Sequence, residues 1–359
     1  MSKKRKNKRK ISRISISIIS FVWILVFVLA FNLLISSIKN KNKLKSIISK
    51  VKIPEGFYYV GGDIDTGVVI SDNKNDEFKG TEYEKVNKLK GNQFVWVPVE
   101  KAVVASLEEA NELVKDDKNP IAIKSEKGYT GLKYTFDSYI NGVVIKDYID
   151  DNNKEPYIIT GEEQGDNEKY IEGSTKELYQ DSFNKMVESV EKNKGFYISR
   201  YEIGNINNAV KNNGKIVSKA SEEDITYMDW INLYKVSKNM YDRDNITTEM
   251  IWGCQWDATL LWLTKNVDIR KYVFDAKLIG NYTGVKKKTA SSKEYCTNNI
   301  YDLAGNAYEW TQRGSALGGR KAYGGYYGTT SFYTLDRTDM YPITHLWNEV
   351  GTRVTMYLN

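Results

Sequence analysis

The sequence predicts an irregular α+β domain behind a single apolar helix at the N-terminus. Residues 14–38 form a run of 25 residues without a charge, whereas the rest of the chain has only a few segments of helical period. Between those segments lie many short stretches rich in Gly, Asn and aromatic residues. The 26 Tyr and 8 Trp among 359 residues provide enough apolar surface for a large core, so disorder is excluded for most of the chain.

Residues 14–38 are longer than the roughly 20 residues that a helix needs to cross a bilayer. Eight basic residues precede this run and four lysines follow it closely, so the positive-inside rule narrowly favours a cytoplasmic N-terminus. A cleaved signal peptide is the alternative, with Val28-Leu29-Ala30 as a passable cleavage site. We expect an uncleaved single-pass anchor in the cell membrane and an extracellular C-terminal part. The predicted divisions are a basic cytoplasmic tail at 1–13, the anchor at 14–38, a stalk at 39–52 and a domain at 53–359.

Charge and cysteine usage exclude several kinds of partner. The formal net charge is +6, but residues 1–52 contain 14 Lys and Arg and no acid, which leaves −8 on the remainder. Nucleic acid is therefore not expected as a partner, because a binding surface for phosphate needs clustered basic residues on the folded part. The single His345 and the two cysteines have no zinc-ligand spacing. Whether Cys254 and Cys296 form a disulfide stays open.

Periodicity and turn residues place the main elements of the domain. We expect strands in 53–72, 91–100 and 195–204, and an insertion of loops and hairpins at about 120–173. Helices are expected from Ala105, from Ser174 to about Asn193, from Thr226 and from Thr247. Loops that are this irregular must satisfy their backbone groups through buried polar side chains or a metal ion.

Four segments in order resemble the sulfatase-modifying-factor family, also called the formylglycine-generating-enzyme family. They are Ile53-Pro54-Glu55-Gly56-Phe57, GFYISRYEIG at 195–204, EMIWGCQWDATLLW at 249–262 and NIYDLAGNAYEWT at 299–311. The closing GTRVTMYL at 351–358 is similar to the final strand of that family. The resemblance implies a C-type-lectin-like fold for residues 53–359.

In that family the segment similar to DLAGNAYEW wraps a calcium ion. Carried over, the resemblance implies Ca²⁺ ligation by the Asp302 and Glu309 side chains and by the Gly305 and Ala307 carbonyls. Two carboxylates and two carbonyls supply part of the six to eight oxygens that calcium takes. The alternative is that both acids stabilise turns and that the neighbouring aromatic residues belong to the core.

The enzymes of the family bind copper through two cysteines shortly after a Gly-Gly pair. The matching stretch from Gly318 to Tyr341 contains no cysteine, and Tyr323 and Gly328 fall near the expected positions. Copper is therefore not expected, because neither residue offers a thiolate. The iron-dependent sulfoxide synthases of the same superfamily need several histidines, and this chain has one. No catalytic residue is assigned.

Recognition is the function that remains most compatible with the sequence. Residues 320–347 are rich in Tyr, Trp and Arg, the residue types that dominate binding hot spots. We predict an extracellular binding module for a glycan or a protein. A modifying enzyme with a non-canonical site and a structural envelope protein are the alternatives. The predicted ligand-binding residues are Tyr323, Tyr327, Tyr333, Arg337 and Trp347.

Overall fold

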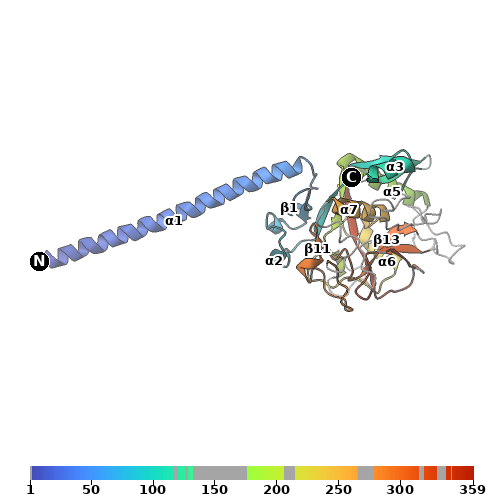
Figure 1. Cartoon of the computed structure of the whole chain (residues 1–359). Helices are drawn as coiled ribbons and strands as arrows, with labels where there is room; N and C mark the ends of the chain where they lie inside the picture. Colours follow the sequence, from blue (N-terminus) through green and yellow to red (C-terminus); the bar gives the residue numbers. More distant parts are fainter. Residues whose placement is uncertain are drawn as a thin grey trace. The chain divides into compact units, whose positions relative to one another are not determined.

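The computed structural model divides the chain into two units, Met1–Lys50 and Val51–Asn359. It contains one long N-terminal helix and a mixed arrangement of helices and strands (Figure 1). The described residues are 2–115, 118, 120–125, 128–131, 176–205, 215–265, 279–314, 319–329, 337–340 and 342–359.

Helix α1 (Ser2–Ile48) is the first unit. Its part Phe21–Ile48 has a mean hydropathy of 2.5, and none of its most apolar stretch is buried. The helix is thus long and apolar enough to span a membrane, although a signal sequence has the same properties. The helix also runs through most of the predicted stalk, because the lysines between residues 39 and 45 are compatible with helix.

A six-stranded antiparallel sheet forms the larger layer of the second unit. Its strand order is β1-β2-β3-β7-β17-β10. The last strand along the chain is therefore inserted between β7 and the edge strand β10, pairing Thr355 with Ile198 on one side and with Glu249 on the other. The strands are β1 (Tyr58–Gly61), β2 (Val69–Ser71), β3 (Gln93–Pro98), β7 (Gly195–Ser199), β10 (Ile246–Met250) and β17 (Val354–Leu358).

A four-stranded sheet of order β15-β14-β13-β16 carries most of the C-terminal region. Its strand β13 pairs with β16 in parallel and with β14 in antiparallel orientation. The short hairpin β11-β12 precedes it. These strands are β11 (Cys296–Thr297), β12 (Ile300–Tyr301), β13 (Tyr308–Gly314), β14 (Arg320–Tyr323), β15 (Arg337–Met340) and β16 (Val350–Thr352).

Smaller sheets and the helices complete the second unit. The predicted insertion begins with ordered strands, since β5 and β6 form a hairpin that pairs with β4; residues 132–173 lie outside the described part. The small strands are β4 (Lys101–Val104), β5 (Pro120–Ser125), β6 (Gly128–Gly131), β8 (Gly204–Asn205) and β9 (Ile216–Val217). The helical segments are η1 (Lys74–Asp76), α2 (Tyr83–Val86), α3 (Leu107–Lys115), α5 (Lys176–Asn193), α6 (Trp230–Lys238), α7 (Gly253–Thr264) and η6 (Lys293–Tyr295).

Two predicted helices begin later than the sequence suggested. The prediction of a helix from Thr247 was wrong, because Ile246–Met250 pairs with β17 and its β-branched residues suit a strand. The helix starts after Trp252, whose backbone N–H donates to the Gln255 side chain (3.1 Å). Helix α6 likewise begins at Trp230 rather than at Thr226. The residue before it, Asp229, caps the helix, because its side chain accepts a hydrogen bond from the Asn232 N–H (2.7 Å).

Three fully buried arginines connect the irregular segments to the sheets. Arg200 donates to the Gln93 side chain (2.8 Å) and to the Asn299 carbonyl (3.0 Å). Arg320 lies over the Trp230 ring. The third, Arg353, directly precedes β17, and its guanidinium reaches three other segments.

Arg353 connects the two larger sheets. Its Nε atom lies 2.7 Å from a carboxylate oxygen of Glu309 on β13. Its other nitrogens donate to the carbonyls of Ser199 at the end of β7 and of Tyr301 on β12. One side chain therefore neutralises a buried acid and satisfies two buried carbonyls.

Replacing this guanidinium should destabilise the protein strongly. We expect Arg353→Met to lower the free energy of unfolding by about 3–5 kcal/mol, because the Glu309 carboxylate and two carbonyls lose their partner. Urea denaturation monitored by tryptophan fluorescence measures the loss. Lys235→Met on an exposed position of α6 is the control and should change stability by less than about 0.5 kcal/mol. Equal stability of the two variants would contradict this role of Arg353.

Candidate functional site

The loop between β12 and β13 is built from tight left-handed turns. Asp302, Gly305 and Asn306 have φ values of 54°, 70° and 62°. Asp and Asn tolerate this conformation better than other residues with a side chain. At Gly305 a Cβ atom would lie 2.5 Å from the Asn281 carbonyl oxygen, so only glycine fits there.

Asn306 holds this loop in place from inside the domain. Its amide nitrogen donates to Glu202 (2.5 Å), and its amide oxygen accepts from the Lys287 backbone N–H (2.9 Å) and from the Asn281 side chain (2.8 Å). Glu202 also accepts from the backbone N–H of Ala307 (3.1 Å). The loop is thereby fixed to two distant segments of the chain.

Four buried carboxylates surround this loop: Glu202, Asp224, Asp302 and Glu309. The cations that accompany them are Arg353 on Glu309 and the half-buried Lys286, whose Nζ lies 3.4 Å from Asp224. Burial raises the pKa of Asp302 to about 7 and that of Glu309 to about 8. Burial also raises the pKa of Glu202 well above its usual range, with the charge of Asp224 as the next cause.

The structure places the predicted calcium ligands inside this cluster. The Asp302 carboxylate accepts a hydrogen bond from the Ala290 backbone N–H (2.7 Å), while Glu309 faces Arg353. Among the residues that are described, no three His, Cys, Asp or Glu side chains gather closely enough to hold a metal ion. Calcium ligation by Asp302, Gly305, Ala307 and Glu309 therefore stays a prediction, in which main-chain carbonyls must supply several ligands.

Next to the carboxylate cluster lies a group of partly exposed aromatic side chains, which we call the aromatic face: Tyr227, Tyr308, Tyr326, Tyr327, His345 and Trp347. The rings of Tyr308 and Tyr326 are 5.4 Å apart, and those of Tyr326 and Tyr327 are 5.2 Å apart. The His345 and Trp347 rings pack edge to face at 4.3 Å.

Backbone hydrogen bonds connect the two halves of the aromatic face through residues 347–349. The Tyr227 N–H donates to the Trp347 carbonyl (2.7 Å), and the Tyr308 N–H donates to the Glu349 carbonyl (2.8 Å). Burial raises the pKa of Tyr327, and the charge of Glu349 raises it further. Tyr327 is itself held by a bond from its N–H to the Asn306 carbonyl (3.0 Å). The carboxylate cluster and the aromatic face therefore share the same loop.

The predicted ligand-binding residues have different surroundings. Tyr327 and Trp347 belong to the aromatic face. Tyr323 is fully buried, with its ring against Trp256 and its hydroxyl 3.3 Å from an Arg313 nitrogen, so it belongs to the core. Only the backbone of Arg337 is described, in β15, and Tyr333 lies outside the described residues.

Sequence reasoning did not select four members of the aromatic face. Tyr326 and His345 lie within the aromatic-rich stretch 320–347, but they were not among the residues chosen from it. Tyr308 directly follows the DLAGNA loop, and that position next to a specific motif was a usable signal. Tyr227 is 53% exposed and belongs to a segment that was expected to be helical, so nothing in its sequence context indicated a role.

The cysteines occupy unrelated positions. Cys254 is in α7 and Cys296 is in β11, and the two form no disulfide with each other. Burial raises the pKa of the Cys296 thiol, which lowers its fraction of reactive thiolate.

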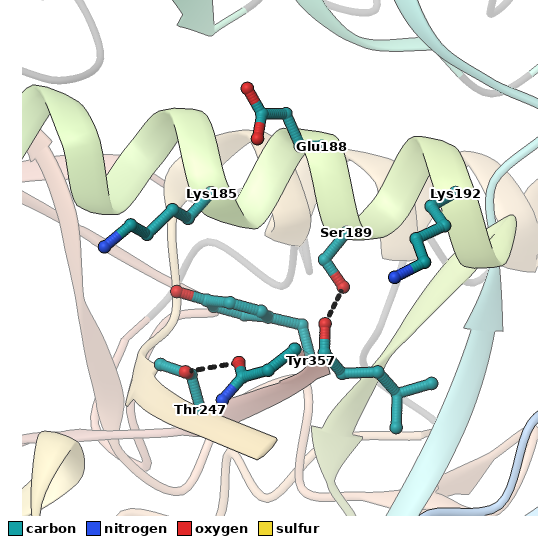
Figure 2. Close-up of a pocket in the computed structure, with 8 residues that line it drawn as sticks. Lys185, Glu188, Ser189, Lys192, Thr247 and Tyr357 are labelled. Carbon is teal, nitrogen blue, oxygen red and sulfur yellow. Dashed lines mark hydrogen bonds between the residues drawn. The ribbon is translucent and has the colours of Figure 1, made fainter. Parts of the chain in front are cut away.

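Two cavities open on the second unit. The first, of about 430 Å³, lies between α5 and the strands β10 and β17 (Figure 2). Its polar groups largely satisfy one another, because Ser189 donates to the Leu358 carbonyl and Thr247 donates to the Asn359 side chain. The second, of about 580 Å³, is lined by residues of four segments: Ile64, Asp65, Thr66, Pro98, Glu100, Trp262, Lys265 and Asn298.

Comparisons with known proteins give a distant structural likeness. No family model matches the chain, and no curated protein matches it in sequence. Treponema denticola variable protein 1 is similar over 45% of this chain and 84% of its own, with 12% identity and a TM-score of 0.33. A crystal structure of CarF is similar over 46% and 87%, with 12% identity and a TM-score of 0.34. PvdO from Pseudomonas aeruginosa is similar over 46% and 81%, with 14% identity and a TM-score of 0.29. Scores this low do not establish a shared fold.

The buried acid Asp302 should make stability fall as the pH rises. Asp302 keeps its proton in the folded state up to about pH 7, whereas the unfolded chain releases it near pH 4. Between about pH 5 and 7 the folded state therefore binds more protons, and Asp302 lowers the free energy of unfolding by up to about 1.4 kcal/mol per pH unit.

Denaturation midpoints measured with a chelator present, from about pH 5 to 7, test this dependence. Asp302→Asn should flatten the profile, because the amide does not titrate. The control Asp242→Asn changes an exposed acid and should leave the slope unchanged. Stability that rises with pH in this window would contradict the assignment.

Proposed function

We propose that the chain is a membrane-anchored recognition module whose extracellular domain binds a glycan or a protein through the aromatic face. The observation that carries the proposal is that two groups of partly exposed rings, Tyr308-Tyr326-Tyr327 and His345-Trp347, are connected by backbone hydrogen bonds through residues 347–349. Tyr and Trp offer large contact areas with few rotatable bonds, so they lose little entropy when they bind. A preformed face also avoids the cost of ordering loops on binding.

The support of the aromatic face favours recognition over a structural role. Two of its residues attach to the loop at 302–307, since Tyr308 directly follows it and the Tyr327 N–H donates to the Asn306 carbonyl. The loop is itself fixed by Asn306 and Glu202. A chain that only packs against neighbours has no need for such a face.

Membership of the sulfatase-modifying-factor family, with a C-type-lectin-like fold, is part of the proposal. It is supported by the way the motif segments meet. The strand from GFYISRYEIG pairs with the strand from GTRVTMYL, and Arg353 connects both to Glu309 of the NIYDLAGNAYEWT segment. An enzyme of this type is disfavoured, because the stretch 318–341 has no cysteine to bind copper.

Removing the central rings should weaken binding. In glycan arrays and panels of extracellular proteins, we expect ligands whose affinity falls at least tenfold in the Tyr327→Ala, Trp347→Ala double variant, about 1.4 kcal/mol or more. Tyr58→Ala, on the outer strand β1, is the control and should bind normally. Ligands that bind the double variant as tightly as the parent protein would contradict the aromatic face as the site.

Calcium binding at the 302–309 loop is a separate proposal. It is supported by the excess of four buried carboxylates over two cations, Arg353 and the half-buried Lys286. A calcium ion held by Asp302, Gly305, Ala307 and Glu309 would neutralise this excess.

Calorimetric titration and thermal unfolding test calcium directly. We expect added Ca²⁺ to raise Tm and Asp302→Asn to abolish the rise, because a site on the folded state stabilises it by mass action. Asp242→Asn is the control. If Ca²⁺ gives neither heat nor a change in Tm, Arg353 is the only cation that Glu309 needs.

A further inference from the structure

The 580 Å³ cavity is separate from the aromatic face and has a different chemical character. Its volume lies within the range of about 300–1,000 Å³ that small-molecule sites occupy. Ile64 and Pro98 form an apolar surface backed by Trp262, which is only 3% exposed, and polar side chains from three loops surround it. This combination of an apolar surface with a few polar groups is typical of a binding site.

The polar rim of the cavity is held rigidly. In the turn after β1, one Asp63 oxygen accepts from the N–H groups of Asp65 (3.1 Å) and Thr66 (2.8 Å). From the other side, Asn298 donates to the Asp65 carbonyl (3.0 Å) and Asn299 donates to the Thr66 carbonyl (2.9 Å). The two loops thus fix each other although more than 230 residues separate them.

The unused polar groups of the rim are mainly hydrogen-bond acceptors. The Asp65 carboxylate forms no hydrogen bond or ion pair within the described part of the chain, and the Asn298 side-chain oxygen accepts none there. The other acid, Glu100, forms a salt bridge with Lys265, so the pair carries no net charge. The cavity therefore presents one free carboxylate and one free amide oxygen beside an apolar surface.

A ligand for this cavity must supply several donors and one apolar side. Sugars have both, since their hydroxyl groups donate to carboxylate and amide oxygens and their C–H faces pack on apolar side chains. An anion is disfavoured because the free group is a carboxylate. We propose that this cavity binds a neutral saccharide, with Asp65 and Asn298 accepting from its hydroxyl groups and Ile64 and Pro98 contacting its apolar face.

Neutral oligosaccharides on an array, followed by calorimetric titration of the bound one, test the proposal. The full chain is used in a detergent without a sugar head group, so that the detergent does not compete. Asp65→Ala removes an exposed side chain without a partner and should weaken binding at least tenfold while Tm is unchanged. Ile64→Ala should weaken binding as well, because less apolar surface then faces the sugar.

Two controls separate this cavity from the aromatic face. Asp242→Ala removes an exposed acid elsewhere and should bind the saccharide normally. If the Tyr327→Ala, Trp347→Ala double variant loses saccharide binding while Asp65→Ala keeps it, the saccharide binds at the aromatic face and not in this cavity, so the two proposals fail separately. The inference is overturned if no neutral saccharide binds more tightly than about 1 mM. It is also overturned if binding survives Asp65→Ala, or if only amines bind and depend on Asp65.

Discussion

A guanidinium without access to water must find anions and carbonyls inside the protein, and Arg353 finds them on three separate segments. The geometry that satisfies Arg353 therefore also sets how β17, β13 and β12 lie relative to one another. Arg200 and Arg320 act in the same way on other loops. Irregular segments lack the regular hydrogen bonds of a sheet. In this domain the buried arginines donate hydrogen bonds to backbone carbonyls instead.

Buried cations also lower the free-energy cost of burying the acids. Glu309 is tolerated because Arg353 is 2.7 Å away, and Asp224 is tolerated because Lys286 is near. Glu202 has no cation in direct contact, but it accepts hydrogen bonds from Asn306 and Ala307. Burial and the nearby charge of Asp224 raise the pKa of Glu202 well above its usual range. The acids of the cluster are thus stabilised by different partners.

The mixed helix and sheet composition and the N-terminal apolar helix could be predicted from the sequence, because both depend on local composition and period. The surroundings of individual C-terminal residues could not. Tyr323 and Tyr327 are four residues apart in a Gly-rich stretch without period, yet one is in the core and the other is partly exposed. That difference depends on the pairing of β14 with β13, where a register irregularity lies between Trp310 and Gly314. Non-local pairing of this kind leaves no local signal.

One continuous segment serves both candidate surfaces. Asn298 stands at the wall of the cavity, Tyr308 belongs to the aromatic face, and Asp302 and Asn306 lie between them in left-handed turns. Because Asn306 and Asp302 are bound to buried partners, a ligand on one surface cannot easily shift the segment to change the other. Rigid support of this kind favours two independent, preformed surfaces over communication between them, since coupling requires an element with two alternative arrangements.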